Sequence, residues 1–398
     1  MRESIVHKPA RAAKRTKKVL LMCAVDFTVL HFLLPLARAL EHRGCQVTIC
    51  CSRGPHFDDI RSAGFDIREN PVARSMNPLS HLASLWQTWR FLRRERFDVI
   101  HVHTPIAALI GRVAARIAGV PVKIYTAHGF YFHDEMPPPQ RALHITLEKV
   151  GARCGDFIMT VSREDERTAI ALGICPPDRI ETIYNGVDTE RFNPAHFSDK
   201  ARADIRQRLG IARDAPVIGI IGRIVREKGF IEFFEAARSI LLKHPRARFL
   251  VVGSTLPSDH DMGESSITRH LESLGIRESC ILTGMADDTA PMLAAMDVFC
   301  LPSYREGMPV SLLEAMSMEL PAVATNIRGC REEITDGDTG LLVPTRDARS
   351  LADSVTWLLD NPEQAHAMGQ RARNRVLRHF DIHDVLDHQL RIYEQLMA

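Results

Sequence analysis

Long apolar runs and paired cysteine motifs are both missing from this 398-residue sequence. The longest apolar stretches are much shorter than the ~20 residues that a membrane-spanning helix needs, so an integral membrane protein is not expected. There are nine cysteines but no C-x-x-C motif, which leaves a zinc site or a dithiol redox motif without support. Five cysteines lie in apolar segments and are expected to be reduced core residues of a cytosolic protein: Cys23, Cys50, Cys51, Cys280 and Cys300.

An excess of charge is missing as well. The formal net charge is +2, which argues against a nucleic-acid-binding protein driven by overall charge. The charge is uneven, however, because residues 1–18 hold seven Lys/Arg residues and one acid, Glu3. This segment lacks an apolar core, so we do not expect a signal peptide. We interpret residues 1–17 as a disordered basic arm; contact with an anionic membrane surface is the alternative.

Short apolar, β-rich runs alternate with amphipathic helical patterns along the whole chain. Continuous apolar strands separated by helices are typical of parallel sheets that are covered on both faces. The sequence therefore predicts an α/β protein with two doubly wound, Rossmann-like domains facing each other across a cleft. The predicted parts are a first domain (18–190), a polar linker without a strand (191–215), a second domain (216–375) and C-terminal helices that pack back on the first domain (376–398).

Two cations follow the first strand of the second domain, in the segment GIIGRIVREKGF. Ligands of doubly wound sheets bind at the carboxyl ends of the strands, so residues just after strands are the candidates for a site. The segment matches neither the dinucleotide fingerprint nor the P-loop. Arg223 and Lys228 suit a diphosphate, because arginine makes paired hydrogen bonds and lysine supplies a compact charge. A solvated basic loop is the alternative.

The segment EGMPVSLLEAM contains two glutamates with seven residues between them, Glu306 and Glu314. Helical spacing places Pro309 near the first turn of a helix, Glu306 in the loop before it and Glu314 inside it. The free N–H groups of a helix start attract an anion. Carboxylates beside such an anion are suited to accepting hydrogen bonds from sugar hydroxyls. The alternative is a capping acid and a surface helix residue.

Histidines mark the ends of two strands in the first half. His128 directly follows a strand and precedes Gly129, which allows close backbone approach. We favour a catalytic or hydroxyl-orienting role for His128 over a core histidine. His101 and His103 lie on one face near the end of another strand, but no third ligand is evident, so a metal site is not expected.

Two further polar motifs have simple structural explanations. Ser162 and Asp165 fit an N-terminal capping pair, and that role is sufficient for them. The DGD at 336–338 resembles the Asp-x-Asp of metal-dependent sugar transferases, but its surroundings favour a turn between a helix and a strand.

Residues 79–97 predict an amphipathic basic helix with two tryptophans. The apolar positions are Leu82, Leu85, Trp86, Trp89 and Leu92, and the nearby cations are Arg90, Arg93, Arg94 and Arg96. Such a helix can lie on an anionic bilayer, although packing on its own sheet is the commoner explanation. Both can hold if the helix docks on the domain and its arginines face lipid.

Taken together, these segments resemble the retaining GT-B glycosyltransferases of family 4. The resemblance covers nearly the whole chain after residue 17 and rests on several motifs in a fixed order: HVHTP, YTAHG, IYNGVDTERFNP, GRIVREKG, EGMPVSLLEAM and PAVATNIRGCREEITDGDTGLLVP. Many members have a Gly-Gly loop after the first strand, whereas this chain has CAVDFTVLHFLLPLA. The variant resembles the subgroup that assembles bacterial capsular polysaccharide, exopolysaccharide or lipid-linked oligosaccharide.

The resemblance implies roles for individual residues. Arg223 and Lys228 would hold the donor diphosphate, Glu306 would accept from the donor sugar, and Glu314 from the ribose. His128 would lie near the anomeric centre. The backbone at 307–309 would lie against the sugar and phosphate, the base pocket would fall around 253 and 282–285, and Asp26 and His103 would lie on the acceptor side. The residues predicted to contact the sugar and phosphate through their backbone are Gly307, Met308 and Pro309, and those predicted around the base are Gly253, Gly284 and Met285.

The implied activity is transfer of a hexose or N-acetylhexosamine from a nucleotide-diphosphate sugar, UDP being favoured, to a polyprenyl-diphosphate-linked or other glycan. We expect retention of configuration, no cofactor and no metal, and a cytoplasmic protein that is peripheral at the inner face of the membrane. The alternatives are a non-hydrolysing nucleotide-sugar epimerase and a catalytically silent nucleotide-sugar-binding scaffold.

Overall fold

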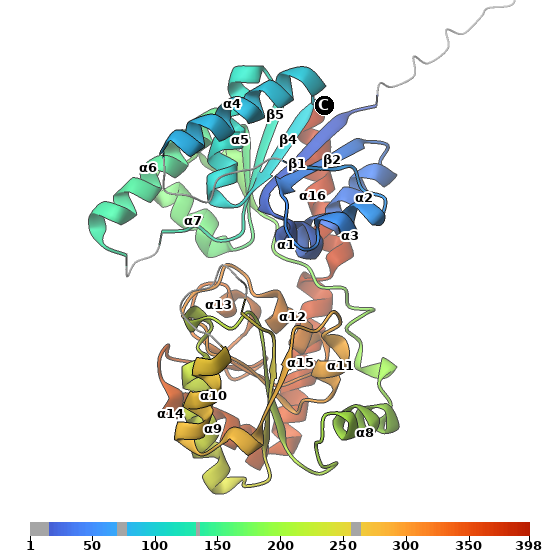
Figure 1. Cartoon of the computed structure of the whole chain (residues 1–398), viewed down its shortest axis with the longest axis vertical. Helices are drawn as coiled ribbons and strands as arrows, with labels where there is room; N and C mark the ends of the chain where they lie inside the picture. The colour runs from blue at the N-terminus through green and yellow to red at the C-terminus, as the bar shows by residue number, and fades with distance from the viewer. Residues whose placement is uncertain (1–15, 70–77, 133–135, 256–263) are drawn as a thin grey trace, which may run out of the picture. The chain divides into compact units, whose positions relative to one another are not determined.

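A computed structural model describes residues 16–69, 78–132, 136–255 and 264–398 (Figure 1). The basic arm, apart from its last residues, lies outside the described residues. Contacts group the chain into two compact units, one of residues 1–126, 137–158 and 396–398 and one of residues 127–136 and 159–395. This grouping differs from the border predicted near residues 190–215, which stays a prediction.

The first sheet has seven strands in the order β3-β2-β1-β4-β5-β6-β7. The pairs among β1 to β5 are parallel, as the predicted doubly wound arrangement requires. The short strand β3 has only its first residue buried, and the apolar pattern did not predict it. The strands are β1 (Lys18–Val25), β2 (Gln46–Ser52), β3 (Ile67–Glu69), β4 (Val99–His103), β5 (Val122–Ala127), β6 (Phe157–Thr160) and β7 (Ile180–Thr182).

Helices connect these strands in alternation with them. A single π-helical turn, Val29–Leu33, joins α1 to α2. The helices are α1 (Asp26–Thr28), α2 (Leu34–His42), α3 (Phe57–Ser62), α4 (Pro78–Glu95), α5 (Pro105–Ala118), α6 (Pro138–Cys154) and α7 (Arg163–Ala171), followed by a 3-10 turn at Pro177–Arg179.

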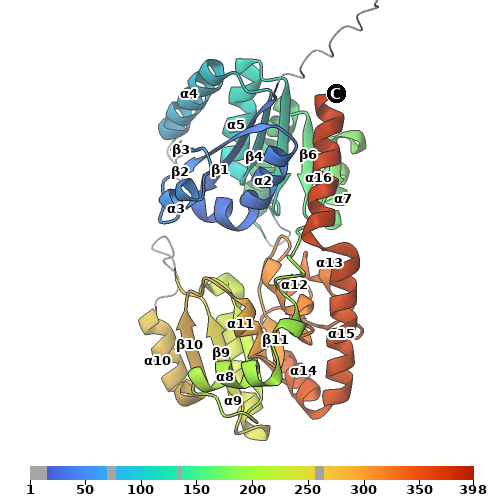
Figure 2. The same ribbon diagram turned by 90° about the vertical axis from the view of Figure 1, so that its right-hand side faces the viewer.

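The second sheet has six parallel strands in the order β10-β9-β8-β11-β12-β13 (Figure 2). Strand β8 is buried along its whole length, which explains its continuous apolar sequence VIGII. The strands are β8 (Val217–Ile221), β9 (Arg248–Val252), β10 (Cys280–Gly284), β11 (Val298–Leu301), β12 (Ala322–Thr325) and β13 (Leu341–Val343).

The predicted linker contains helix and no strand, as its polar sequence indicated. Helix α16 returns to the edge strand β7, where His388 Nε2 lies 2.7 Å from Glu181 Oε1. The helices here are α8 (Asp199–Arg208), α9 (Phe230–Lys243), α10 (Glu264–Leu274), α11 (Ala290–Ala294), α12 (Val310–Ser317), α13 (Cys330–Glu333), α14 (Ala348–Asp360), α15 (Pro362–His379) and α16 (Ile382–Met397), with 3-10 turns at Pro194–His196, Arg226–Lys228 and Arg277–Ser279.

A buried arginine fixes α5 against α6 in the first unit. Arg112 is 1% exposed, donates to Glu148 Oε2 at 3.2 Å and lies over the ring of Tyr125. A side chain at Gly151 on α6 would collide with the guanidinium of Arg112, and one at Gly155, just after α6, would press on its Cδ atom, so these two glycines make room for the arginine. The pair is therefore one packed unit rather than a surface ion pair.

All nine cysteines are free, and seven of them are buried, as the sequence predicted for reduced core residues. No helix in the described part of the chain is long and apolar enough to cross a membrane.

Candidate functional site

The predicted diphosphate residues lie where the strand order of the second sheet reverses. Strand β8 has β9 on one side and β11 on the other, so the loops after β8 and β11 leave the sheet in opposite directions. Such a switch point is the usual ligand site of a doubly wound sheet. Arg223 and Lys228 follow β8, and Glu306 follows β11, so the fold places these three predicted residues at one switch point. Arg223 is exposed.

Lys228 and Glu306 are in direct contact. Lys228 Nζ lies 2.6 Å from Glu306 Oε1, and Ser303 Oγ donates to the same oxygen at 2.7 Å. The two side chains are 24% and 10% exposed, so the pair is only partly shielded from solvent. A diphosphate placed here would compete with Glu306 for the lysine. The loop thus offers one cation and one hydrogen-bond acceptor side by side.

Helix α12 has the phase that the sequence predicted. Pro309 is its N-cap, Glu306 precedes it, and Glu314 is its fifth residue. No side chain caps this helix, so Glu306 is not the capping acid of the alternative interpretation. Thr289 Oγ1 donates to Glu314 Oε2 at 3.1 Å. Burial raises the pKa of Glu314 to about 7, while the hydrogen bond from Thr289 lowers it, so Glu314 is not a freely solvated surface residue.

Three glycines lie side by side at the carboxyl ends of β8, β9 and β10. Gly253 N donates to Gly284 O at 2.8 Å, and a side chain at Gly253 would collide with the backbone of Gly222. Gly253 has a φ of 139°, which excludes most other residues. These glycines leave an edge of bare backbone where the base pocket was predicted. Met285, the next residue, is half exposed.

A second group of glycines joins three segments that are far apart in sequence. A Cβ atom at Gly307 would collide with the carbonyl of His128, and one at Gly329 would collide with the carbonyl of Gly307. Gly129 also packs on the Cα atom of Gly307. The backbone of Gly307 therefore lies between the His128–Gly129 segment and Gly329, and the predicted residues His128, Glu306 and Gly307 come together.

Asn185 supports the next residue of this loop and was not foreseen. Its Nδ2 donates to Met308 O at 2.8 Å, and its backbone N–H lies 3.1 Å from Met308 Sδ. Met308 itself is 4% exposed. The motif IYNGVD contains this asparagine, but only the fold shows that it reaches across 123 residues of sequence.

The histidines have different environments. Burial lowers the pKa of His128 to about 4, so its imidazole is neutral at physiological pH and can either donate or accept a hydrogen bond. His101 is fully buried, and its Nε2 lies 2.7 Å from Thr126 Oγ1. The rings of His101 and His103 lie 4.1 Å apart, with His103 2% exposed. No cluster of three metal-binding side chains occurs among the described residues.

Asp26 connects two loops at the carboxyl edge of the first sheet. It is 4% exposed and accepts from the backbone N–H groups of Phe27 at 2.9 Å and His56 at 2.7 Å. A side chain at Gly54 would collide with its carboxylate. These bonds give Asp26 a structural role; its predicted position facing an acceptor stays a prediction.

The DGD segment forms the predicted turn between α13 and β13. Gly337 has a φ of 74°, and Asp336 Oδ1 accepts from Leu342 N at 2.9 Å. Asp338 forms an ion pair with Arg371 at 2.6 Å. Both carboxylates therefore have structural partners.

The capping role of Ser162 is confirmed, since its Oγ accepts from Asp165 N at 3.3 Å at the start of α7. Ser162 has a further partner that was not predicted. Glu332, on α13, accepts hydrogen bonds from Ser162 Oγ and from two backbone N–H groups of α7. The acidic pair in RGCREE is the only local sign of this contact, and it does not indicate which helix the carboxylates will contact.

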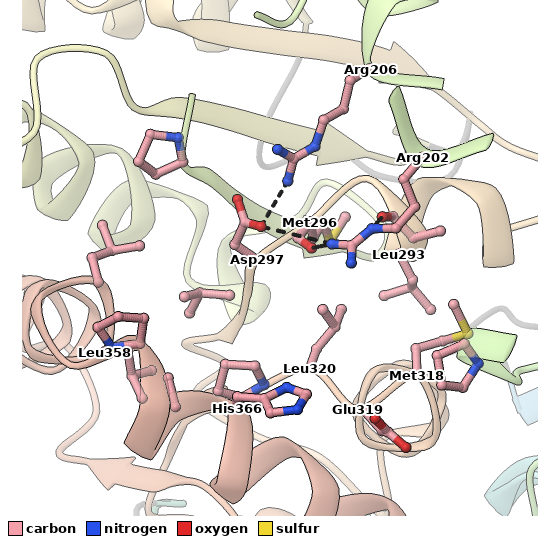
Figure 3. Close-up of a pocket in the computed structure, with 18 of the residues that line it drawn as sticks. Arg202, Arg206, Leu293, Met296, Asp297, Met318, Glu319, Leu320, Leu358 and His366 are labelled. Atoms are coloured by element: carbon pink, nitrogen blue, oxygen red, sulfur yellow. Dashed lines mark hydrogen bonds and ion pairs between the residues drawn. The ribbon is translucent and has the colours of Figure 1, made fainter. Parts of the chain in front are cut away.

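A cavity of about 460 Å³ lies elsewhere in the second unit (Figure 3). Residues at or just before the starts of β8 and β11 line it, among them Pro216 and Asp297, so it belongs to the opposite edge of the sheet from Lys228 and Glu306. Figure 3 shows Arg206 and Arg202 directed at Asp297. Arg206 also donates to the carbonyl of Ala295 at 3.0 Å, so these arginines stabilise the chain around the strand starts.

Two doubly wound sheets, with cations and a glutamate at the switch point of the second sheet, are the features that the resemblance to GT-B sugar transferases predicted. Comparison with known proteins supports this classification. Residues 201–375 match the family described as Glycosyl transferases group 1, and residues 31–191 match Glycosyltransferase Family 4. The structure of Anabaena HepE in complex with UDP and glucose has a TM-score of 0.81 at 18% identity, covering 95% of this chain and 100% of that one.

Relatives in sequence point the same way. The putative glycosyltransferase EpsD of Bacillus subtilis is 30% identical over 370 residues, 91% of this chain and 93% of that protein. An Escherichia coli protein named UDP-Gal:alpha-D-GlcNAc-diphosphoundecaprenol alpha-1,3-galactosyltransferase is 29% identical over 84% of each chain. The chain belongs to the group 1 glycosyltransferases and has the GT-B fold. It is a glycosyltransferase.

Proposed function

We propose that this glycosyltransferase moves a hexose or N-acetylhexosamine from a UDP-sugar to a hydroxyl of a polyprenyl-diphosphate-linked glycan, with retention of configuration and without a metal ion. The observation that carries the proposal is the contact between Lys228 and Glu306 at the switch point, with Arg223 on the same loop as Lys228. This arrangement offers positive charge to a diphosphate and an acceptor to a sugar hydroxyl at one place.

The names of relatives support the choice of substrates. The Escherichia coli relative is named for a UDP-Gal donor and a diphosphoundecaprenol-linked acceptor. A Campylobacter jejuni relative, 24% identical over 93% of this chain, is named for an N-acetylgalactosamine transfer to a diphospho-undecaprenol-linked sugar. Both names combine a hexose-type donor with a lipid diphosphate acceptor.

In the proposed mechanism the leaving diphosphate also acts as the base. The bond between the anomeric carbon and the diphosphate oxygen breaks, and the acceptor hydroxyl attacks the same face of the sugar. Its proton passes to a diphosphate oxygen. Arg223 and Lys228 stabilise the negative charge that develops on the leaving group, and the start of α12 adds its dipole. These groups supply the charge that a metal ion would otherwise provide.

The remaining predicted residues orient the donor. His128, as a neutral imidazole, bonds a sugar hydroxyl near the anomeric carbon, and Glu306 accepts from another. Glu314 accepts from the ribose. The backbone at Gly307 to Pro309 lies against the sugar and phosphate, and the glycine edge at Gly253 and Gly284, with Met285, borders the base.

A panel of nucleotide sugars tests the donor. We expect UDP-sugars to raise the melting temperature more than GDP- or ADP-sugars, because tight binding to the native state stabilises it. Transfer from the best donor to a short-chain polyprenyl-diphosphate GlcNAc should proceed fully in EDTA. Strict dependence on a divalent ion would contradict the metal-independent mechanism.

The same reactions separate the two alternatives, which the relatives do not favour. An epimerase would convert the UDP-sugar in the absence of acceptor, and a silent scaffold would bind it without transfer or hydrolysis. NMR of the product's anomeric centre tests retention directly.

We also propose that the protein is peripheral at the cytoplasmic face of an anionic membrane. Helix α4 divides its apolar residues between two sides: Leu92 is buried, whereas Leu79, Leu82 and Trp86 are 72%, 61% and 54% exposed. The sequence raised this helix and the arm at residues 1–18 as candidates for lipid contact. An amphipathic helix with exposed leucine, tryptophan and arginine suits the interface of an anionic bilayer.

Helix α6 adds a second exposed apolar row that was not predicted. Leu143, Leu147 and Val150 are 56%, 38% and 40% exposed, and both α4 and α6 contact α5. Of the two acids in these three helices, Glu148 is buried against Arg112 and Glu95 bonds to arginines. Their cations outside the buried pair are Arg90, Arg93, Arg94, Arg116, Arg141, Lys149 and Arg153.

The paired change Leu143→Glu and Leu147→Glu tests this surface. We expect about 30-fold weaker binding to vesicles containing phosphatidylglycerol, since two added charges at about 1 kcal/mol each weaken binding to such a surface by about 2 kcal/mol. Leu242→Glu is the matched control, because Leu242 on α9 is 86% exposed and lies in the other unit. Equal binding of both variants in a flotation assay would contradict the role of α6. UDP binding should not change in either.

A further inference from the structure

The start of helix α7 is occupied by a carboxylate from a residue far along the chain. Glu332 Oε2 accepts from Arg163 N at 2.9 Å, and Oε1 accepts from Glu164 N at 3.0 Å and from Ser162 Oγ. The N–H groups in the first turn of a helix have no partner within the helix, and the dipole favours a negative charge there. Glu332 thus supplies the anion that this helix start attracts.

A buried ion pair joins the same two segments. Arg328, just before α13, contacts Asp165 in the first turn of α7 through its guanidinium. Asp165 is 0% exposed. Burial raises the pKa of Asp165 to about 6, while Arg328 lowers it. Breaking a buried pair by removing one partner is strongly destabilising, so this contact, together with that of Glu332, holds α7 against α13. We call these two contacts the joint between α7 and α13.

Each side of this joint leads directly to the backbone of the candidate site. On the α7 side, Val161 N donates to Ala127 O at 3.4 Å, and Ala127 immediately precedes His128. On the α13 side, Gly329 is the N-cap of the helix and packs on the carbonyl of Gly307. The joint therefore connects the segment of His128 with the loop that follows Glu306.

The other end of α13 is also held. Arg375 on α15 donates to the carbonyl oxygens of Glu332 at 2.6 Å and Glu333 at 2.7 Å. These carbonyls are among the groups that a helix end leaves without helical partners. With both ends fixed, α13 cannot shift without moving Gly329 or releasing Glu332.

We propose that Glu332 is a positioning residue for sugar transfer, because its carboxylate holds the His128–Gly129 segment in register with the Gly307 loop. The proposal rests on the function proposed above. A small misplacement of groups around a reacting centre can reduce a rate by as much as about 10²-fold without removing any contact to substrate. The effect should therefore fall on the chemical step rather than on nucleotide binding.

An exposed ion pair between the same two helices provides the control. Arg331 on α13 lies 2.7 Å from Glu164 on α7, with side chains 41% and 40% exposed. Exposed pairs of this kind contribute little to stability. Arg331→Met removes that pair and the hydrogen bonds from Arg331 to Asn326, but leaves the Glu332 carboxylate and the two backbone N–H groups that bind it.

The experiment compares Glu332→Gln, Glu332→Ala and Arg331→Met in the full-length chain. We expect kcat, with the donor selected by the panel, to fall at least about tenfold in Glu332→Ala and less in Glu332→Gln, which keeps one acceptor oxygen. The dissociation constant for UDP should stay within about threefold of wild type. Arg331→Met should behave as wild type in all three measurements of kcat, UDP affinity and melting temperature.

Two results would overturn the proposal. One is wild-type kcat in folded Glu332→Ala; the other is a loss in kcat no larger than the loss of folded protein, which would make Glu332 a structural cap only. If Glu332→Ala does not fold, the isosteric Glu332→Gln decides between these outcomes by the same measurements. Failure of the proposed function is distinct, because wild-type protein itself would then show no transfer.

Discussion

Replacing Lys228 with alanine should slow sugar transfer by about 10²–10³-fold at saturating donor, the usual effect of losing one preorganised donor to a developing charge. The structure adds a second reason. Lys228 Nζ is 2.6 Å from Glu306 Oε1, so the alanine variant would leave the carboxylate beside the diphosphate without its cation. Arg223→Ala should have a similar effect, because Arg223 is the second cation proposed to contact the diphosphate. Initial rates at saturating UDP-sugar give the comparison.

Controls separate a phosphate contact from simple neutralisation of Glu306. Lys243→Ala removes an exposed lysine from the far end of α9 and should leave the rate unchanged. The double variant Lys228→Ala with Glu306→Gln removes both charges together. Recovery of most of the activity in the double variant would mean that Lys228 serves only Glu306, and turnover near wild type in Lys228→Ala would reject the diphosphate assignment.

Binding of UDP should weaken as the pH falls below about 7, and Glu314 should be responsible. Burial raises the pKa of this carboxyl to about 7, so it is protonated below that pH in the free protein and ionised above it. In the proposed site the ribose hydroxyls donate to this carboxylate and would therefore favour its ionised form, so that binding would release a proton in the acid range. We expect affinity up to about 30-fold lower at pH 5.5 than at pH 8.

Calorimetric titration of UDP between pH 5.5 and pH 8 in wild type and Glu314→Gln tests this. UDP has its own titrating phosphate, and the glutamine variant supplies that baseline. We also expect Glu314→Gln to weaken UDP binding more than it lowers kcat, with Glu306→Gln showing the reverse. Equal pH dependence in wild type and Glu314→Gln would remove Glu314 from the ribose site.

The arrangement around α12 was predictable because local rules determine it. A proline before an apolar helical pattern placed Glu306 in the loop and Glu314 within the helix, and the structure has Pro309 as the N-cap. Strand runs such as VIGII indicated the buried parallel sheets for the same reason. These properties depend on neighbours within a few residues.

Contacts between distant segments could not be predicted in the same way. The Lys228–Glu306 pair spans 78 residues, and Ser162 and Glu332 are 170 residues apart. Nothing local distinguishes Glu332 from the adjacent Glu333, yet one binds a helix start and the other is fully buried. The short strand β3 was missed because two of its three residues are not buried.

The glycines that meet at Gly307 limit how this enzyme can change its donor. A side chain at Gly129 or Gly329 would meet the backbone of Gly307, and one at Gly307 would meet the carbonyl of His128, so a substitution at any of the three displaces a neighbouring backbone segment. This part of the proposed donor site would therefore present only backbone groups to a donor. A change in sugar preference should therefore arise at side chains around these glycines, and engineering should begin with Asn185, which bonds the carbonyl of Met308, rather than with the glycines.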